Sequence, residues 1–270
     1  MKKFNYIITL FFIFITLNHS SYASNKFITL QSTTSTRDSG LYNYLLPIFE
    51  KEFKIDIRLV AVGTGQALSN IRNCDGDLAI THAPNLEKIY LSKGYISERI
   101  EFMYNDFVFI GPNSDPLNIA TSSNPDEVLS KIYSNKTKFI SRGDSSGTHI
   151  SELNLWGRAY LSPEIYKDTW YMEVGQGMGA TLNIAIGSNA YTYSDRSTWI
   201  NFKNKSNHKI LYSNSELLKN QYSLLLANST RCPKTKNYLI NIFKEWLLSE
   251  EGKLLIKSYM VKNQVLFHVD

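Results

Sequence analysis

The feature that most constrains this chain is a rhythm of short apolar runs, each followed by a polar turn and an amphipathic segment. Residues 26–31, 55–62 and 77–80 are runs that predict strands, and helices are predicted from near Ser39 and from Thr64. Strand–turn–helix repeats of this kind are typical of parallel sheets with crossover helices. We therefore predict an α/β fold built around parallel sheet.

The same rhythm returns with different residues farther along the chain. The strands predicted there are residues 107–110, 138–140, 170–174, 190–193 and 222–227. The helices predicted there are residues 124–133, one segment after each of the turns at 141–147 and 175–179, and two segments within 234–259. No internal repeat or long linker interrupts this order, so we expect two α/β lobes.

The length of 270 residues suits two lobes of roughly 100 to 150 residues each. We place the crossings between them near residues 104–112 and 205–222. Lobe I is expected to comprise residues 24–106 and 215–270, because the last helices return to it, and lobe II residues 107–214. Two lobes joined by more than one crossing form a ligand cleft that closes by hinging.

The first 23 residues predict an export signal peptide. Lys2 and Lys3 give a positive start, residues 7–17 form an apolar core of 11 residues, and Ser21 and Ala23 are small residues that a signal peptidase reads. No internal run approaches the roughly 20 apolar residues that span a bilayer. We therefore expect cleavage near Ala23 and a periplasmic location.

Composition and charge narrow the class of protein and of partner. With 43% hydrophobic and 20% charged residues, the chain is an ordinary globular protein rather than a disordered one. The net charge of +5 comes from 29 basic and 24 acidic residues spread along the chain. Without a basic stripe, no nucleic-acid partner is expected.

The chain has two cysteines, Cys74 and Cys232. An even number in an oxidising compartment permits one disulfide, and two separate buried thiols are the equal alternative. Too few His and Cys residues stand at ligand spacing for a zinc site, so no direct protein–metal bond is expected.

Three polar turns each follow a predicted strand and open a predicted helix, at residues 32–40, 62–66 and 141–149. Unpaired N–H groups and the helix dipole favour anions there, hydroxyls add neutral donors, and glycines allow close approach. The third turn also carries Arg142, whose guanidinium matches paired oxygens of a tetrahedral anion. Taken singly, each turn is better explained by helix capping than by ligand binding. The three together favour a site for a small oxyanion.

Other motifs point to other chemistry. Gly175-x-Gly177-x-x-Ala180 fits a relaxed dinucleotide fingerprint, but no complete mononucleotide unit precedes it. Ser146 and His149 lie three residues apart on a predicted helix, which places both on one face as a conceivable hydrolase pair, although no nucleophile-elbow motif is present. The hydrolase interpretation stays a remote alternative.

Aromatic and charged residues near the end of lobe II have two interpretations. Tyr191, Tyr193 and Trp199 either line the cleft or pack in the core. Asp195 and Arg196 are interpreted as a structural ion pair near the hinge.

The combination of motifs resembles the TupA-type tungstate-binding proteins, in the order of that family, from about residue 28 to 228. The matching runs are residues 32–41, 60–68, 81–84, 105–108, 111–112, 141–148, 177–182 and 191–199. The family consists of solute-binding components of ABC importers with a two-lobed periplasmic-binding-protein fold of type II. The resemblance implies a monomer that captures tungstate, with molybdate as a weaker competitor, and delivers it to a membrane permease. It implies no cofactor and no catalysis.

The resemblance also implies a set of binding residues. The family's run Thr-Thr-Thr-Ser falls on residues 32–35, with Ser32 in place of the first Thr, and its arginine falls on Arg142. The implied ligands of the oxyanion are Thr33, Thr34, Ser35, Thr64, Arg142, Ser145, Ser146, Gly147 and Thr148, with Ser32, Gly177, Met178 and Gly179 as further candidates.

Phosphate or another oxyanion is the alternative ligand for the same fold. Phosphate carries a proton at neutral pH, and its binders typically use a carboxylate to accept it. Asp38 and Asp144 are near enough in sequence to the polar turns to do so. The run from Arg142 to Thr148 also resembles phosphate-binding proteins of this fold.

Overall fold

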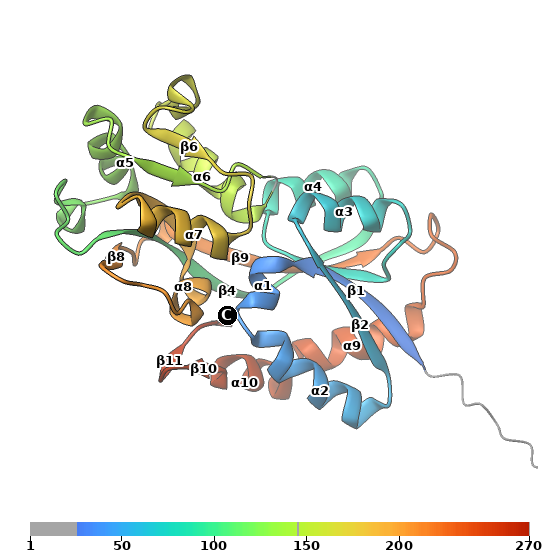
Figure 1. Cartoon of the computed structure of the whole chain (residues 1–270). Coiled ribbons are helices and arrows are strands. Elements are labelled where there is room, and N and C mark those ends of the chain that lie inside the picture. The colour runs from blue at the N-terminus through green and yellow to red at the C-terminus, as the bar shows by residue number, and fades with distance from the viewer. Residues whose placement is uncertain (1–25, 145, 270) are drawn as a thin grey trace, which may run out of the picture.

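A computed structural model describes residues 26–144 and 146–269 of the chain as a mixed α/β protein with two lobes (Figure 1). The predicted signal peptide and Ser145 lie outside the described residues. Among the helices of the described part, none is long and apolar enough to cross a membrane.

The strands form one connected path in the order β2-β1-β3-β9-β4-β7-β5-β6, with β8 also paired to β4, and β10 and β11 form a small separate hairpin. The strands are β1 (Phe27–Thr33), β2 (Asp56–Val62), β3 (Leu78–Thr81), β4 (Ile96–Pro112), β5 (Phe139–Ser141), β6 (Tyr171–Glu173), β7 (Tyr191–Asp195), β8 (His208–Tyr212), β9 (Lys219–Ala227), β10 (Met260–Val261) and β11 (Gln264–Val265).

Parallel pairing holds where the strand–helix rhythm predicted it. Strand β1 pairs in parallel with β2 and β3, and β5 pairs in parallel with β6 and β7. The strands that connect the lobes differ, because β9 is antiparallel to β3 and β4, and β7 and β8 are antiparallel to β4. The fold is therefore two parallel units joined through antiparallel strands.

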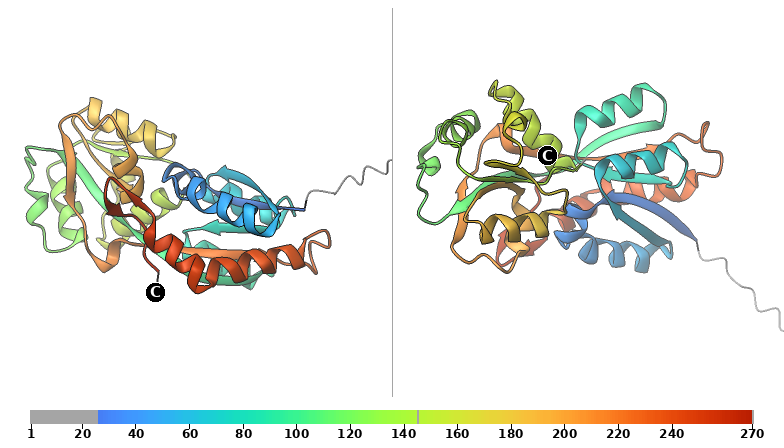
Figure 2. Two further views of the ribbon diagram at one scale, coloured as in Figure 1. Left: turned by 90° about the horizontal axis from the view of Figure 1, so that it is seen from below. Right: turned by 45° about the horizontal axis from the view of Figure 1, so that its top comes forward.

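Strand β4 runs through both lobes. Its residues 96–106 pair with β9 beside β3, whereas residues 107–110 pair with β7, and residues 109–112 with β8. Both β4 and β9 run between the two bodies in the views of Figure 2. A change of pairing partner inside one continuous strand gives the lobes a shared spine on which they can rotate.

Helices cover both faces of the sheet in each lobe. The helices are α1 (Thr34–Asp38), α2 (Leu41–Phe53), α3 (Thr64–Arg72), α4 (Pro84–Ser92), α5 (Pro125–Ser134), α6 (Gly147–Arg158), α7 (Met178–Gly187), α8 (Arg196–Asn201), α9 (Asn237–Leu248) and α10 (Glu250–Ser258), with short 3₁₀ turns at Ile119–Thr121, Pro163–Tyr166 and Glu216–Leu218.

The core of lobe I joins both ends of the chain. Leu30 of β1 and Phe49 of α2 pack in one buried cluster with Phe243 of α9 and Ile256 of α10. Helices α3 and α4 lie on the opposite face, over a smaller cluster that includes Leu68 and Leu225. The last helices thus pack against the first strands. In lobe II an aromatic cluster fills the space between the sheet and helices α5 and α6.

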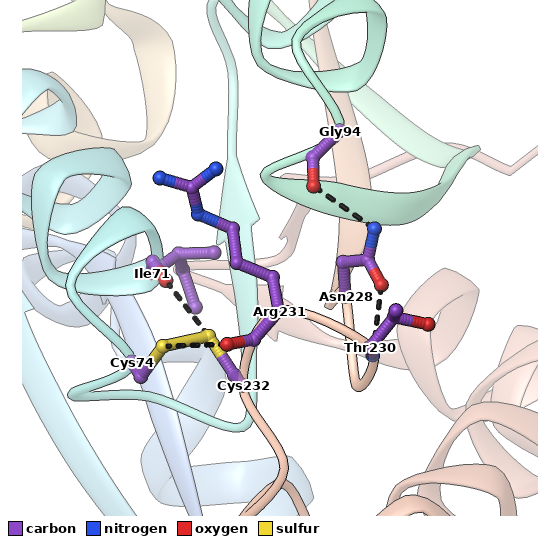
Figure 3. The surroundings of a disulfide bond; sticks show 7 residues. All are labelled: Ile71, Cys74, Gly94, Asn228, Thr230, Arg231 and Cys232. Carbon is purple, nitrogen blue, oxygen red and sulfur yellow. Dashed lines mark hydrogen bonds between the residues drawn. A yellow bond between two sulfur atoms is a disulfide. The ribbon is translucent and has the colours of Figure 1, made fainter.

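A disulfide joins Cys74, just after α3, to Cys232 in the loop after β9, with their Cα atoms 5.4 Å apart (Figure 3). The sequence left open whether these two cysteines form a disulfide, and in this structure they do. Asn228 in the same loop donates to the carbonyl of Gly94 and accepts from the N–H of Thr230. These contacts anchor the C-terminal end of α3, whose other end carries Thr64.

Candidate oxyanion site

In lobe I, the turn after β1 is a compact set of hydroxyls. Thr33 is the N-cap of α1, and its hydroxyl oxygen accepts from the N–H of Thr36 at 3.3 Å. The same oxygen lies 2.6 Å from Oγ1 of Thr36 and 3.1 Å from Oγ of Ser35. These hydroxyls are buried and bonded to one another, whereas Thr34 between them is half-buried. The hydroxyls of this turn thus hold one another in place.

Helices α3 and α6 meet at their N-terminal ends. The backbone N–H of Gly147, the first residue of α6, donates to the hydroxyl of Thr64, the first residue of α3, at 3.0 Å. Both residues are buried. This bond joins positions 83 residues apart, so two of the three predicted turns converge. Their helix dipoles add positive potential at one place.

His82, which follows β3, connects these turns. Its Nε2 lies 3.2 Å from Oγ of Ser35, and its Nδ1 lies 2.9 Å from Oδ1 of Asn220. A Cβ at Gly147 would lie 2.5 Å from the imidazole ring, so only glycine fits where α6 begins. Burial lowers the pKa of His82 below its ordinary value of 6.5, with the nearby Asp195 and the Asn220 bond acting in the opposite direction. His82 thereby holds the first and third turns side by side.

Arg142 and Thr148 carry polar atoms without partners. The side chain of Arg142 is only 3% exposed, and its Nε and Nη1 have no hydrogen-bond partner among the described residues. The same is true of the hydroxyl of Thr148, which is fully buried. Leaving buried donors unsatisfied costs free energy, most of all when the group is charged. The arrangement is therefore suited to an anion that accepts from these groups.

Three contacts support the position of Arg142. Its Nη2 donates to Oδ2 of Asp144 at 2.6 Å. Gly143 has a φ of +60° and lies so close to Glu173 that a Cβ would meet the Glu173 side chain at 2.4 Å. The hydroxyl of Ser141 donates to Glu152 at 2.8 Å, from beneath the turn. Asp144 thus holds the guanidinium, while Glu173 and Glu152 fix the turn that carries it.

Glu152 is a fully buried carboxyl in lobe II that accepts from three side chains. Besides Ser141, it accepts from Nε1 of Trp156 at 3.1 Å and from the hydroxyl of Tyr171 at 2.9 Å. Burial raises the pKa of Glu152 to about 7, although these three hydrogen bonds act in the opposite direction. The Glu152 carboxyl, which lies beneath the turn that carries Arg142, therefore titrates near neutral pH.

Some predicted residues point elsewhere. The hydroxyl of Ser32 donates to the carbonyl of Ile80 and contacts the hydroxyl of Tyr42, inside lobe I. Met178 packs in the core that includes Trp199. Gly177 is the N-cap of α7, and the turn before it lies beside Arg142, because the N–H of Gln176 donates to the Arg142 carbonyl at 3.3 Å. Within the described residues, neither Gly177 nor Gly179 forms a hydrogen bond with α3.

The hydrolase geometry is not formed at Ser146 and His149. The hydroxyl of Ser146 caps α6 by accepting from the N–H of His149 at 3.2 Å. The His149 ring contacts the carbonyl of Asp144 through Nδ1 and lies 3.5 Å from Glu173 through Nε2. The imidazole therefore has no bond to the serine hydroxyl that it would need to activate.

The predicted ion pair between Asp195 and Arg196 is wrong. Arg196 forms a bidentate pair with Asp106 at 2.7 and 2.6 Å, across the strand junction of the two lobes. Asp195 instead caps α8, accepting from the N–H of Thr198 at 2.8 Å. Consecutive side chains at the end of a strand point in different directions. Arg196 therefore pairs with a residue 90 positions away in the sequence and not with its neighbour.

The aromatic residues near the end of lobe II are core residues. Tyr191 and Tyr193 belong to the lobe II cluster, and Trp199 belongs to the cluster that fills lobe I. Their second interpretation, core packing, is the one that the structure supports.

Sequence reasoning did not single out His82 and Asn220 as site residues. Their roles follow from a contact between residues 138 apart, which no local pattern reveals. The single available signal was that His82 follows a buried strand directly, at the end of the sheet where the polar turns also lie. A cavity of about 300 Å³ opens beside these two residues and Gly147.

Comparison with known proteins gives consistent relatives. A profile of the PBP superfamily domain matches residues 20–251. The tungstate-binding protein TupA of Peptoclostridium acidaminophilum is 40% identical over 86% of this chain and 81% of the relative. TupA of Campylobacter jejuni is 35% identical over 87% of this chain and 88% of the relative. A putative ABC transporter anion-binding protein of Haloferax volcanii is 35% identical over 93% of this chain and 74% of the relative.

Solved structures agree with these relatives. The tungstate-binding protein TupA of Desulfovibrio alaskensis superposes with a TM-score of 0.80 at 38% identity, covering 91% of this chain and 99% of that chain. A tungstate ABC transporter structure from Geobacter sulfurreducens superposes with a TM-score of 0.79 at 39% identity, covering 86% and 98%. At this identity the agreement extends over nearly the whole described chain.

Proposed function

We propose, from the premise that this chain belongs to the TupA-type tungstate-binding proteins of the PBP superfamily, that it captures tungstate outside the cytoplasm. It delivers the anion to the membrane permease of an ABC importer. Molybdate is the weaker competitor, and the ligand is bound as an intact oxyanion without a cofactor.

The observation that carries this proposal is the buried guanidinium of Arg142. It is 3% exposed, and two of its nitrogens have no partner among the described residues. Tungstate is fully deprotonated at neutral pH, so its oxygens only accept hydrogen bonds. A site of donors around a buried cation therefore suits it.

The proposed site is built from donors of both lobes, which we define as residues 24–106 with 215–270, and residues 107–214. The hydroxyl donors come from the α1 turn and from α3 in lobe I, and the arginine and the α6 N-terminus come from lobe II. The proposed ligands are Thr33, Thr34, Ser35, Thr64, Arg142, Ser145, Ser146, Gly147 and Thr148, with backbone donors at Gly177 and Gly179.

Phosphate is the second candidate ligand. The two carboxylates predicted to accept its proton are engaged, since Asp38 is half exposed and paired with Arg37, and Asp144 is paired with Arg142. Asp195 supports this candidate, because its Oδ2 is buried without a donor among the described residues. Asp195 lies close enough to His82 to affect its pKa.

Calorimetric titration with tungstate, molybdate, phosphate and sulfate tests the proposal. We expect tight binding of tungstate, weaker binding of molybdate, and no heat from the other two anions. Tight phosphate binding with no tungstate binding would show an anion site assigned to the wrong anion. Absence of binding by all four would overturn the oxyanion function.

Three further properties belong to the proposal. The protein is a binding protein and not an enzyme, in keeping with the names of its relatives and with the separation of Ser146 from the His149 ring. It acts as a monomer in the periplasm. Its signal peptide is cleaved near Ala23, which mass spectrometry of the exported protein would check.

A further inference from the structure

A chain of side-chain hydrogen bonds runs from the oxyanion site into the junction of the lobes. Nδ1 of His82 lies 2.9 Å from Oδ1 of Asn220, and Nδ2 of Asn220 donates to Oδ1 of Asn105 at 2.6 Å. Nδ2 of Asn105 then donates to the hydroxyl of Ser197 at 3.2 Å, and that hydroxyl contacts Oδ1 of Asp195 at 2.5 Å. All five residues are buried.

The carboxylate of Asp195, at the end of this series of hydrogen bonds, determines which group donates in every bond of the series. An ionised Asp195 only accepts, so the hydroxyl of Ser197 donates to it and must accept from the amide nitrogen of Asn105. The oxygen of Asn105 then accepts from the nitrogen of Asn220, whose own oxygen accepts from His82. Nδ1 of His82 therefore carries a proton in every state that keeps this chain.

This direction determines what Ser35 does on the other side of the ring. When His82 is neutral, its Nε2 is an acceptor, and the Ser35 hydroxyl 3.2 Å away must donate to it. The hydroxyl proton is then unavailable to an anion. When His82 carries a second proton, Nε2 donates to Ser35, and the serine proton is free to turn elsewhere, toward a ligand oxygen or the Thr33 hydroxyl 3.1 Å away.

We propose that His82 is a positioning residue that takes up a proton from solvent when the oxyanion binds, and thereby converts Ser35 into a donor to the anion. This inference rests on the proposed function, because Ser35 must face the bound oxyanion. The proton enters with the ligand and leaves with it. Binding is therefore a joint uptake of one dianion and one proton.

The groups around His82 make this uptake feasible. Asp195 and Glu87 raise its pKa, Arg142 lowers it, and burial lowers it most. Glu87 is already paired with Arg99 at 2.9 Å, and the ring of Tyr222 stacks on the imidazole at 4.9 Å between centroids. A bound dianion adds negative charge beside Arg142. This negative charge offsets the positive charge of Arg142, which disfavours protonation of His82.

Two measurements on the mature protein test the inference. Nitrogen NMR of the ligand-free protein near pH 7.5 is expected to show His82 neutral with its proton on Nδ1, and added tungstate is expected to convert it to imidazolium at about the same pH. Calorimetry in buffers of different ionisation enthalpy is expected to show uptake of up to about one proton per tungstate. The affinity then falls as the pH rises above the lowered pKa of His82, by up to about tenfold per pH unit.

Three variants separate this role from a structural one. His82→Gln removes the titration, so we expect weaker tungstate binding with no proton uptake. Ser35→Ala keeps the imidazole but removes the hydroxyl, and we expect lower affinity with reduced uptake. His208→Gln is the matched control, because His208 is also buried with a lowered pKa but is bonded to the Ala190 carbonyl in lobe II. It should bind tungstate with the uptake of the wild type.

The possible outcomes distinguish the role of His82 from the proposed oxyanion-binding function on which it rests. Tungstate binding without proton uptake, or a neutral His82 protonated on Nε2, would overturn the role of His82 and leave the oxyanion function standing. A wild-type protein that binds none of the oxyanions would overturn both.

Discussion

The two lobes prepare their sides of the cleft in different ways. In lobe I the hydroxyls of Thr33, Ser35 and Thr64 already have hydrogen-bond partners. In lobe II the guanidinium of Arg142 and the hydroxyl of Thr148 are buried with atoms that have none among the described residues. Lobe I therefore offers hydroxyls that are already paired, whereas lobe II offers donors with no acceptor among the described residues. We expect the lobe II donors to gain more from an acceptor than the lobe I hydroxyls do.

The lobes also differ in how they are stabilised. Lobe I is cross-linked by the disulfide between Cys74 and Cys232. Lobe II depends on an aromatic cluster and on the buried carboxyl of Glu152. Loss of the cross-link should therefore act on lobe I, and a change of pH near neutrality should act on lobe II.

The largest effect is expected from removing the disulfide. In the double variant Cys74→Ser/Cys232→Ser, the free energy of unfolding should fall by roughly 4 to 5 kcal/mol, because the cross-link restricts a long loop of the unfolded chain. Urea unfolding of the oxidised wild type and of the variant measures this difference. Tungstate affinity at low temperature should stay near that of the wild type. An unchanged midpoint would show that lobe I does not depend on its cross-link.

The next effect is the pH dependence that comes from Glu152. Its pKa of about 7 lies above the ordinary value of 4.5, so its contribution to stability is fully present below about pH 4.5 and is lost as the pH rises through about 7. We expect a loss on the order of 3 kcal/mol from this group across that window. Glu152→Gln should remove it. Unfolding of both proteins at several pH values measures the difference, and parallel curves would contradict it.

The third prediction concerns the arginine of lobe II. Arg142→Ala should weaken tungstate binding at least about tenfold, about 1.4 kcal/mol or more, because the charge-assisted donors are lost. Arg72→Ala is the control, since Arg72 is exposed at the end of α3 that lies farthest from Thr64. It should leave the dissociation constant unchanged. Equal constants for all three proteins would remove Arg142 from the site.

The smallest effects compare one hydroxyl from each lobe. Thr148→Val should weaken tungstate binding by about 1 kcal/mol while leaving the ligand-free protein at least as stable, because that hydroxyl has no partner to lose. Thr33→Val should instead destabilise the ligand-free protein by about 1 kcal/mol, because it removes the cap of α1. Calorimetry should show weaker tungstate binding in both variants, whereas thermal unfolding should show a loss of stability only in Thr33→Val. Equal losses of stability in both variants would contradict the contrast between the lobes.

Local patterns in the sequence predicted most elements to within a few residues. Apolar runs such as residues 55–62 and 138–140 are bounded by polar turns, and the structure places β2 and β5 there. Helix α4 and strand β8 were not predicted, and β4 is 17 residues long although only residues 107–110 were predicted. Glu98, Arg99 and Glu101 interrupt its first half with charges, so no apolar run is visible. Glu98 pairs with Lys244 of α9 on one face of the sheet, and Arg99 pairs with Glu87 of α4 on the other.

Contacts between residues far apart in the sequence could not be predicted from local patterns. Polar turns at strand ends predicted where donors gather, and the bond between Gly147 and Thr64 brings two of them together. The contact of His82 with Asn220 and the pairing of Arg196 with Asp106 depend instead on how β4 and β9 cross between lobes. The antiparallel direction of β9 follows from the same crossing. No local pattern encodes it.

The disulfide has a topological consequence. Its two cysteines are 158 residues apart, and the intervening chain includes every strand and helix of lobe II. The chain between the two cysteines is therefore a covalently closed ring that contains all of lobe II, and the disulfide that closes it lies in lobe I (Figure 3). A protease that cuts once anywhere in lobe II, for example beside the exposed Tyr160, opens the ring but releases no fragment. The nicked protein migrates as one molecule until its disulfide is reduced.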